Sequence, residues 1–109
     1  MGKKTSLSPA TSSKANLTEV GRVEQSLQIT NQLGLHARAA ASFVKIANRF
    51  RSSITVKKDT VAVNGKSIMG VLMLAAPKGT LITLIAEGPD AAAAAVALAQ
   101  LIHDKFGEE

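Results

Sequence analysis

The sequence contains no cysteine, no tryptophan and no tyrosine. Without cysteine the chain can form neither a disulfide framework nor a thiolate metal site. Its two histidines are a poor set of zinc ligands on their own, so we expect no metal centre. A chain without disulfides suits a reducing compartment, and we expect the protein to be cytoplasmic.

Long apolar runs are also missing. The stretch Ala91–Ala99 is too short to cross a bilayer and consists mostly of alanine. The N-terminus lacks the apolar segment of a secretory signal peptide. We therefore expect no insertion into a membrane.

The net charge of +5 is unevenly distributed along the chain. Residues 1–22 carry four basic residues and one acidic residue, whereas residues 23–109 carry nine basic and seven acidic residues. The first segment is rich in Ser, Thr, Lys and Ala and has little to bury, which predicts a disordered basic extension. The remaining 23–109 is long enough for a single domain with one core, and this domain is close to neutral.

Hydrophobic periodicity predicts the elements of that domain. Alternation from Val23 indicates a strand, and helical spacing follows from Ala37. The predicted elements are a strand at 23–30, a helix at 37–49, strands at 53–57 and 60–63, a short helix capped by Ser67, a strand at 80–86, and a final helix that has Pro89 in its first turn and ends at Gly107. The order β-α-β-β-α-β-α favours an α+β fold with helices on one face of a mixed or antiparallel sheet.

The residues best suited to chemistry lie in the segment GLHARAAA at positions 34–41. His36 is predicted where a glycine-containing loop meets the start of a helix. The first N–H groups of a helix have no intrahelical acceptor and favour an anion. Much of an imidazole is uncharged near neutral pH, so His36 is a competent nucleophile. A phosphoryl group on it would lie beside these N–H groups, and Arg38 would add charge and paired donors.

The sequence favours a phosphoryl carrier over two other classes of function. A lone histidine at a helix start is often only a cap, and a hydrolase would need a carboxylate to orient its base, yet no acidic residue lies close to His36 in the sequence. A nucleic-acid-binding sheet would need exposed aromatic residues, but Phe43 and Phe50 fall on the core side of their helix. We therefore expect a carrier that does not bind nucleic acid.

Two segments resemble one known family. ITNQLGLHARAA at 29–40 resembles the active-site segment of the HPr family, the histidine phosphocarriers of the bacterial phosphotransferase system, whose pattern is roughly G-L-H-A-R-P-A. VNGKSIMGV at 63–71 is similar to the regulatory serine segment of that family, and the spacing between the segments also fits. The similarity covers about residues 23–109. It implies an open-faced β-sandwich, with a four-stranded antiparallel sheet and three helices on one face.

The resemblance also implies a mechanism. Enzyme I, charged by phosphoenolpyruvate, would phosphorylate His36 at Nδ1, and the phosphate would pass to an EIIA-type domain. Arg38 would help to hold the phosphate. The resemblance implies no cofactor, and it implies a protein that acts as a co-substrate rather than as an enzyme. We expect a monomer.

Ser67 resembles the family's regulatory serine, the target of an HPr kinase/phosphorylase. A phosphate there adds roughly −1.5 to −2 charges near a helix start. A plain helix cap explains the same serine equally well, so both roles stay open. Beside it, four apolar residues resemble a docking patch for partner proteins: Ile68, Met69, Val71 and Leu72.

The sequence departs from the family pattern at two positions near His36. Ala39 stands where the family usually has proline, which restores a backbone N–H and frees φ. Leu33 stands where sugar-type members often have a polar residue, which is more like the nitrogen-related branch. The KSIMGV segment is instead like kinase-regulated HPr of Gram-positive bacteria. Sugar import and a purely regulatory role both stay open.

Overall fold

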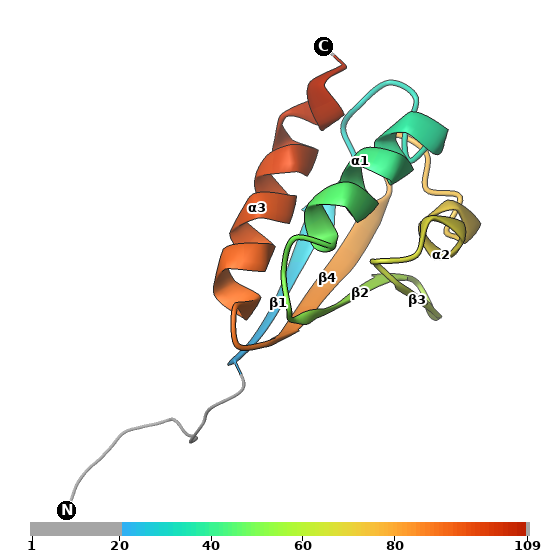
Figure 1. Cartoon of the computed structure of the whole chain (residues 1–109). Helices are drawn as coiled ribbons and strands as arrows, with labels where there is room; N and C mark the ends of the chain where they lie inside the picture. The colour runs from blue at the N-terminus through green and yellow to red at the C-terminus, as the bar shows by residue number, and fades with distance from the viewer. Residues whose placement is uncertain (1–20, 109) are drawn as a thin grey trace, which may run out of the picture.

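The computed structural model describes residues 21–108, and the predicted extension at 1–22 lies outside this range except for its last two residues (Figure 1). Those two residues belong to the sheet. Strand β1 (Gly21–Gln28) begins two residues before the predicted boundary, because Gly21 and Arg22 pair with Gly88 and Glu87 of the neighbouring strand.

The four strands form one antiparallel sheet. Strands β2 (Ser53–Lys58), β3 (Val61–Asn64) and β4 (Leu81–Gly88) join β1 in the order β1-β4-β2-β3. The first and last strands of the domain therefore lie side by side in the sheet. Inward side chains alternate with outward ones, as the sequence predicts: Ile82, Leu84 and Ala86 of β4 are buried and their neighbours are not.

Three helices pack on one face of this sheet, which confirms the predicted α+β open-faced sandwich (Figure 1). Helix α1 (Ala37–Ala47) lies beside α3 (Ala91–His103), and the short α2 (Ile68–Met73) packs against α1 and β3. The core lies between the helices and the sheet, with Phe43 of α1 and Leu98 of α3 among its largest buried side chains. Among residues 21–108, no helix is both long and apolar enough to span a bilayer.

Helix α1 ends two residues earlier than the sequence predicted. The side-chain amide of Asn48 donates to Val44 O (2.9 Å) and Lys66 O (3.2 Å). A short polar side chain that bonds to the preceding turn competes with continuation of the helix. Asn48 thus ends α1 and ties its last turn to the segment that leads into α2.

The prediction for the last helix was wrong at both ends. Pro89 precedes the helix, because Asp90 is the N-cap residue and α3 starts at Ala91. At the other end α3 stops at His103, since Lys105 and Phe106 each adopt a φ of 56° that no α-helix accommodates. A short 3₁₀ turn, η1 (Lys105–Gly107), carries the chain back toward the start of α1.

Candidate phosphoryl-acceptor site

The loop before α1 is fixed by a glycine. Gly34 has a φ of +66°, and a Cβ at this position would lie 2.4 Å from Ala76 O and 2.8 Å from Pro77 Cα. The N–H of the next residue, Leu35, donates to the same Ala76 carbonyl oxygen at 2.9 Å. Only glycine allows the backbone to approach the segment between α2 and β4 this closely. This contact fixes the position of His36.

His36 is the N-cap residue of α1. Its backbone is extended (φ −75°, ψ 178°), and its carbonyl oxygen accepts the first helical hydrogen bond, from the Ala40 N–H at 2.8 Å. Its ring atom Nδ1 accepts a hydrogen bond from the Arg38 N–H at 3.3 Å. The imidazole therefore takes the place that a serine or aspartate side chain takes in most N-caps, at the positive end of the helix dipole.

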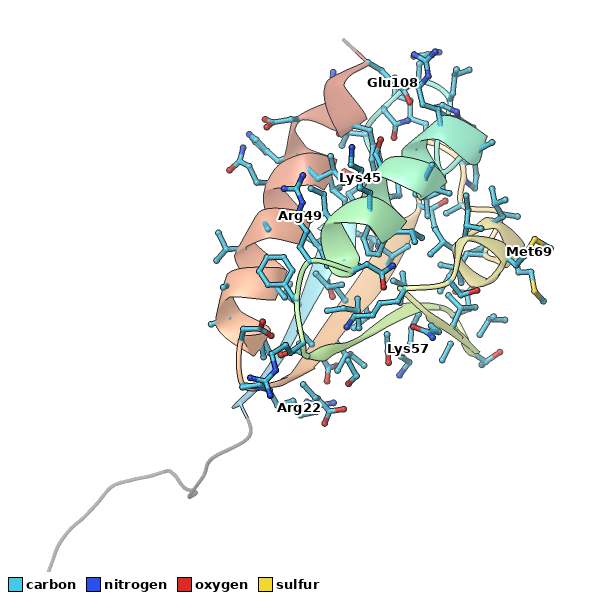
Figure 2. All side chains as sticks on the ribbon, in the orientation of Figure 1. Arg22, Lys45, Arg49, Lys57, Met69 and Glu108 are labelled. Carbon is cyan, nitrogen blue, oxygen red and sulfur yellow. The ribbon has the colours of Figure 1, made fainter. Side chains whose placement is uncertain are left out.

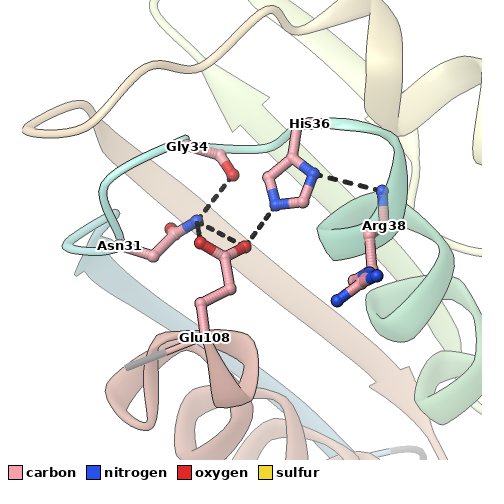
Figure 3. Close-up of polar contacts among 5 residues, drawn as sticks. All are labelled: Asn31, Gly34, His36, Arg38 and Glu108. Carbon is pink, nitrogen blue, oxygen red and sulfur yellow. Dashed lines mark hydrogen bonds and ion pairs between the residues drawn. The ribbon is translucent and has the colours of Figure 1, made fainter.

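The other ring nitrogen of His36 contacts the opposite end of the chain. Nε2 donates to Glu108 Oε2, and both carboxylate oxygens of Glu108 accept from Asn31 Nδ2 at 3.1 Å (Figure 3). Asn31 Nδ2 also donates to Gly34 O at 2.8 Å. Hydrogen bonds from His36 and then from Asn31 hold the pKa of Glu108 below its ordinary value of 4.5.

These contacts determine which nitrogen of His36 carries the proton. Nδ1 faces a donor, the Arg38 N–H, so it must offer its lone pair. Nε2 faces a carboxylate, so it carries the hydrogen. In this tautomer the nucleophilic lone pair lies at the helix start, where a bound anion meets unpaired N–H groups.

Arg38 is the second residue of α1, two positions after His36. Its side chain is exposed and forms no ion pair within the described part of the chain, 21–108. Its positive charge helps to lower the pKa of Glu108, a smaller contribution than the hydrogen bonds make. A guanidinium without a carboxylate partner is available for phosphoryl oxygens. Residues 21–108 contain no group of acidic and histidine side chains that could hold a metal ion.

Ser67 is the N-cap residue of α2, and its hydroxyl oxygen accepts from the Gly70 N–H at 3.2 Å. Its side chain is half-buried. Within residues 21–108, no carboxylate or imidazole forms a hydrogen bond with this hydroxyl. The expected cap role of Ser67 is therefore present, and none of the described residues supplies a base in hydrogen-bond contact with its hydroxyl.

The apolar patch beside Ser67 differs from the predicted one. Val71 is fully buried in the core, and Leu72 is partly buried against it, so Val71 cannot belong to a docking surface. Ile68 is exposed, and Met69, which is 66% exposed, points away from the domain (Figure 2). Met73 at the end of α2 is 73% exposed and was not predicted. We call the exposed set Ile68, Met69 and Met73 the α2 patch.

The comparison with known proteins identifies the family. A family model described as the PTS HPr component phosphorylation site matches residues 23–104. The chain belongs to the HPr family. It is 52% identical over 86 residues to phosphocarrier protein HPr of Neisseria meningitidis, which covers 79% of this chain and 97% of the relative. It is also 45% identical over 83 residues to HPr-like protein Crh of Bacillus subtilis, which covers 76% of this chain and 98% of the relative.

Solved HPr structures share the fold. The crystal structure of an HPr from Thermoanaerobacter tengcongensis matches with a TM-score of 0.78 at 49% identity, covering 80% of this chain and 98% of that chain. An HPr from Bacillus anthracis matches with a TM-score of 0.70 at 47% identity, covering 72% of this chain and 94% of that chain. The chain is therefore a phosphocarrier of the HPr type by family, and the predicted family and fold are confirmed.

Two residues of the site were missed by sequence reasoning. The expectation that no acid accompanies His36 holds only along the sequence, because the chain reversal after α3 brings Glu108 to it from 72 residues away. Asn31 lies in the loop before α1 and is nevertheless fully buried, and sequence reasoning gave it no role in the site. The one local signal was the spacing Asn31-x-x-Gly34, since asparagine side chains often bond to the backbone within a turn.

Proposed function

We propose that this HPr-family protein carries phosphate in the phosphoenolpyruvate-dependent phosphotransferase system, taking it from enzyme I on Nδ1 of His36 and delivering it to an EIIA-type domain. The observation that carries the proposal is the hydrogen bond from the Arg38 N–H to Nδ1, which leaves the Nδ1 lone pair at the start of α1. A nucleophile and an anion-binding helix end thus coincide in one residue.

The transfer step uses few groups. The Arg38 N–H releases Nδ1, whose lone pair then attacks the phosphorus of the phosphoryl group carried by enzyme I. The bond from phosphorus to the donor atom of enzyme I breaks, and its electron pair stays on that donor atom. The phosphoryl oxygens then accept hydrogen bonds from the first N–H groups of α1 and from the Arg38 side chain. Transfer to the EIIA-type domain is the same displacement with His36 as the leaving group. The chain is used and regenerated, and it acts as a co-substrate rather than as an enzyme.

We propose the α2 patch as part of the surface that partner proteins contact, because it exposes two methionine side chains on the helix that Ser67 caps. Ser67 is then the target of an HPr kinase/phosphorylase, and the kinase supplies the base that none of the residues 21–108 places at this hydroxyl. Phosphorylation of Ser67 and its cap role are compatible, because the same hydroxyl oxygen lies at the start of α2 before and after phosphorylation. The proposed setting is the cytoplasm, and the proposed working form is a monomer, although one HPr of Thermoanaerobacter tengcongensis has been solved as a dimer.

A second function is favoured by one observation at the same site. Leu33, only three residues before His36, is 68% exposed, so the position that resembles the nitrogen-related branch lies on the surface that a partner would meet. The second candidate is therefore a regulatory HPr-like binding protein with no role in sugar transport. The two functions differ in which EIIA-type domain accepts the phosphate.

The test is incubation with enzyme I and labelled phosphoenolpyruvate, followed by addition of sugar-type or nitrogen-type EIIA. Wild-type protein should take up acid-labile, alkali-stable label and pass it on, and His36→Ala should take up none. Arg38→Ala should slow uptake about tenfold, because a charge-assisted bond to phosphate is lost. Arg49→Ala, in the turn beyond the other end of α1, should not. No label on wild-type protein, with an enzyme I that charges its own HPr, would refute the carrier function.

A further inference from the structure

The chain reverses sharply after α3. Lys105, Phe106 and Gly107 have φ values of 56°, 56° and 77°, three successive residues in the left-handed region. For the two residues with side chains this conformation costs roughly 1–2 kcal/mol each. Backbone strain of this kind persists only where the surrounding structure enforces it, and it often marks a functional element. We call residues 105–108 the C-terminal hook.

The hook is held by contacts on both of its faces. Phe106 is only 9% exposed and packs into the core formed by the helices. Past it, the Glu108 N–H donates to Lys105 O at 3.0 Å, which closes the turn. The hook contacts both α1 and α3, and it delivers the Glu108 carboxylate to the start of α1 (Figures 1 and 3). The Glu108 side chain is 14% exposed there.

Asn31 orients the carboxylate of Glu108. Its Nδ2 group donates to both oxygens of Glu108 and to Gly34 O, so the opposite amide orientation would put an oxygen against three oxygens. The Asn31 side chain is fully buried, and its Oδ1 has no partner among the described residues. A buried amide that leaves one atom unpaired is costly, which argues that its donor side is needed where it is.

We propose that Glu108, aimed by Asn31 and delivered by the C-terminal hook, is a positioning residue that holds the His36 ring with Nε2–H directed at the carboxylate and the Nδ1 lone pair at the start of α1. The inference rests on the proposed function only for its consequence, the rate of phosphoryl transfer. The orientation of the ring is a property of the free protein.

The charge of Glu108 also matters during the transfer. When Nδ1 forms a bond to phosphorus while Nε2 keeps its hydrogen, the ring gains a positive charge. The carboxylate at Nε2 offsets that charge in the transition state and in the phosphorylated protein. Glu108 therefore acts through the ring, on the side that the phosphoryl group does not reach.

Three variants separate hydrogen bonding from charge. Glu108→Gln keeps an acceptor for Nε2–H and loses the charge, whereas Glu108→Ala loses both. Asp104→Asn is the matched control, because it removes one negative charge from an exposed residue of the same terminal segment whose carboxylate accepts from the Gln100 side chain. Thermal unfolding of each variant reports its stability separately.

The decisive readout is NMR of the ¹⁵N-labelled His36 ring without any partner. Wild type and Asp104→Asn should show an Nε2–H resonance at low field, Glu108→Gln should show it at higher field, and Glu108→Ala should lose it to solvent exchange. Uptake of phosphate from enzyme I should fall about fivefold in Glu108→Gln and about thirtyfold in Glu108→Ala, and should change less than about twofold in the control.

The proposal is overturned if Glu108→Ala keeps the wild-type ring resonance, or if its uptake rate equals that of the control. A Glu108→Ala protein that loses thermal stability and nothing else would also overturn it, because Glu108 would then have a structural role alone. If wild-type protein accepts no phosphate, the proposed function fails, and the ring spectra still decide whether Glu108 orients His36.

Discussion

His36 and Ser67 occupy equivalent places in two helices of the same domain. Each is an extended N-cap residue whose side chain accepts a hydrogen bond from a backbone N–H, of Arg38 in α1 and of Gly70 in α2. The two side chains differ in the contacts that they make away from the helix. The His36 ring is held from behind by Glu108, whereas no side chain among residues 21–108 forms a hydrogen bond with the Ser67 hydroxyl.

Because of this difference, both helix starts can bind an anion, but only the start of α1 has a cap residue arranged to react with one. A helix start supplies unpaired N–H groups to any cap residue, because they belong to the backbone. Making the cap residue a nucleophile requires a lone pair aimed outward and a group that accepts the proton or charge on the opposite side. At α1 the distant residue Glu108 lies in that position, whereas none of the described residues does so at Ser67. The proposed phosphorylation of Ser67 therefore depends on a second protein.

The largest expected effect comes from the loop that positions His36. Gly34→Ala should lower the free energy of unfolding by about 3 kcal/mol or more, because its Cβ would overlap the Ala76–Pro77 backbone in a left-handed conformation. The matched variant at α2 is Gly70→Ala, whose Cβ would lie 3.1 Å from Asn64 O in a helical conformation. It should change the free energy of unfolding by at most about 1 kcal/mol. Urea unfolding measures both, and equal losses would contradict the special role given to Gly34.

The start of α3 also has a polar residue at its N-cap, Asp90, but the contacts of this residue stabilise the fold. Asp90 precedes α3, and its carboxylate accepts from the Ser52 hydroxyl (2.6 Å), the Ser52 N–H (2.9 Å) and the Arg51 N–H (3.0 Å). The Ser52 hydroxyl, followed by the Arg51 N–H, lowers the pKa of Asp90 from 3.8 to about 2. This carboxylate joins the α1–β2 loop to the start of α3.

The stability that Asp90 contributes should depend on pH. Because its pKa is lower in the folded protein, the stabilisation is complete above the unfolded pKa and is lost as the pH falls from 3.8 to about 2. Asp90→Asn should therefore unfold at a lower temperature than wild type at neutral pH, with a smaller loss than Gly34→Ala. The two melting temperatures should converge as the pH approaches the lowered pKa of about 2, and phosphate uptake by folded Asp90→Asn should be unchanged. A constant difference across this pH range would contradict the assignment.

The smallest effect is expected at the α2 cap. Ser67→Ala removes the acceptor for the Gly70 N–H and should lower the free energy of unfolding by about 1 kcal/mol. Ser67→Asp supplies another good cap and should restore most of that stability. Chemical denaturation of the two variants checks this. If Ser67→Ala lost enzyme I-dependent labelling, the phosphoryl acceptor would be Ser67 at the start of α2, and the assignment of His36 would be contradicted.

Local patterns were enough to predict the order of elements and the position of His36. Alternation in β1 and β4 and helical spacing in α1 reflect burial on one face, which the sequence encodes directly. The docking residues predicted on α2 show where local patterns fail. Ile68, Met69, Val71 and Leu72 cover most directions around a short helix, so at least one of them had to face the core.

The tertiary part of the site could not be predicted in this way. Nothing local indicates that Lys105 and Phe106, neither of them glycine, adopt left-handed conformations. That turn is stabilised by the burial of Phe106 against elements distant in sequence, and it alone brings Glu108 to His36. The proposed phosphoryl acceptor, His36, is thus encoded locally, whereas the contact of Glu108 with it is encoded by the fold.

The most direct test of this account is to determine which atom carries the phosphoryl group. The ¹⁵N-labelled protein, phosphorylated by enzyme I, is examined by NMR for coupling between phosphorus and the ring nitrogens of His36. The account predicts coupling to Nδ1, with the hydrogen retained on Nε2 against Glu108. Coupling to Nε2, or phosphate on any other residue, would contradict it.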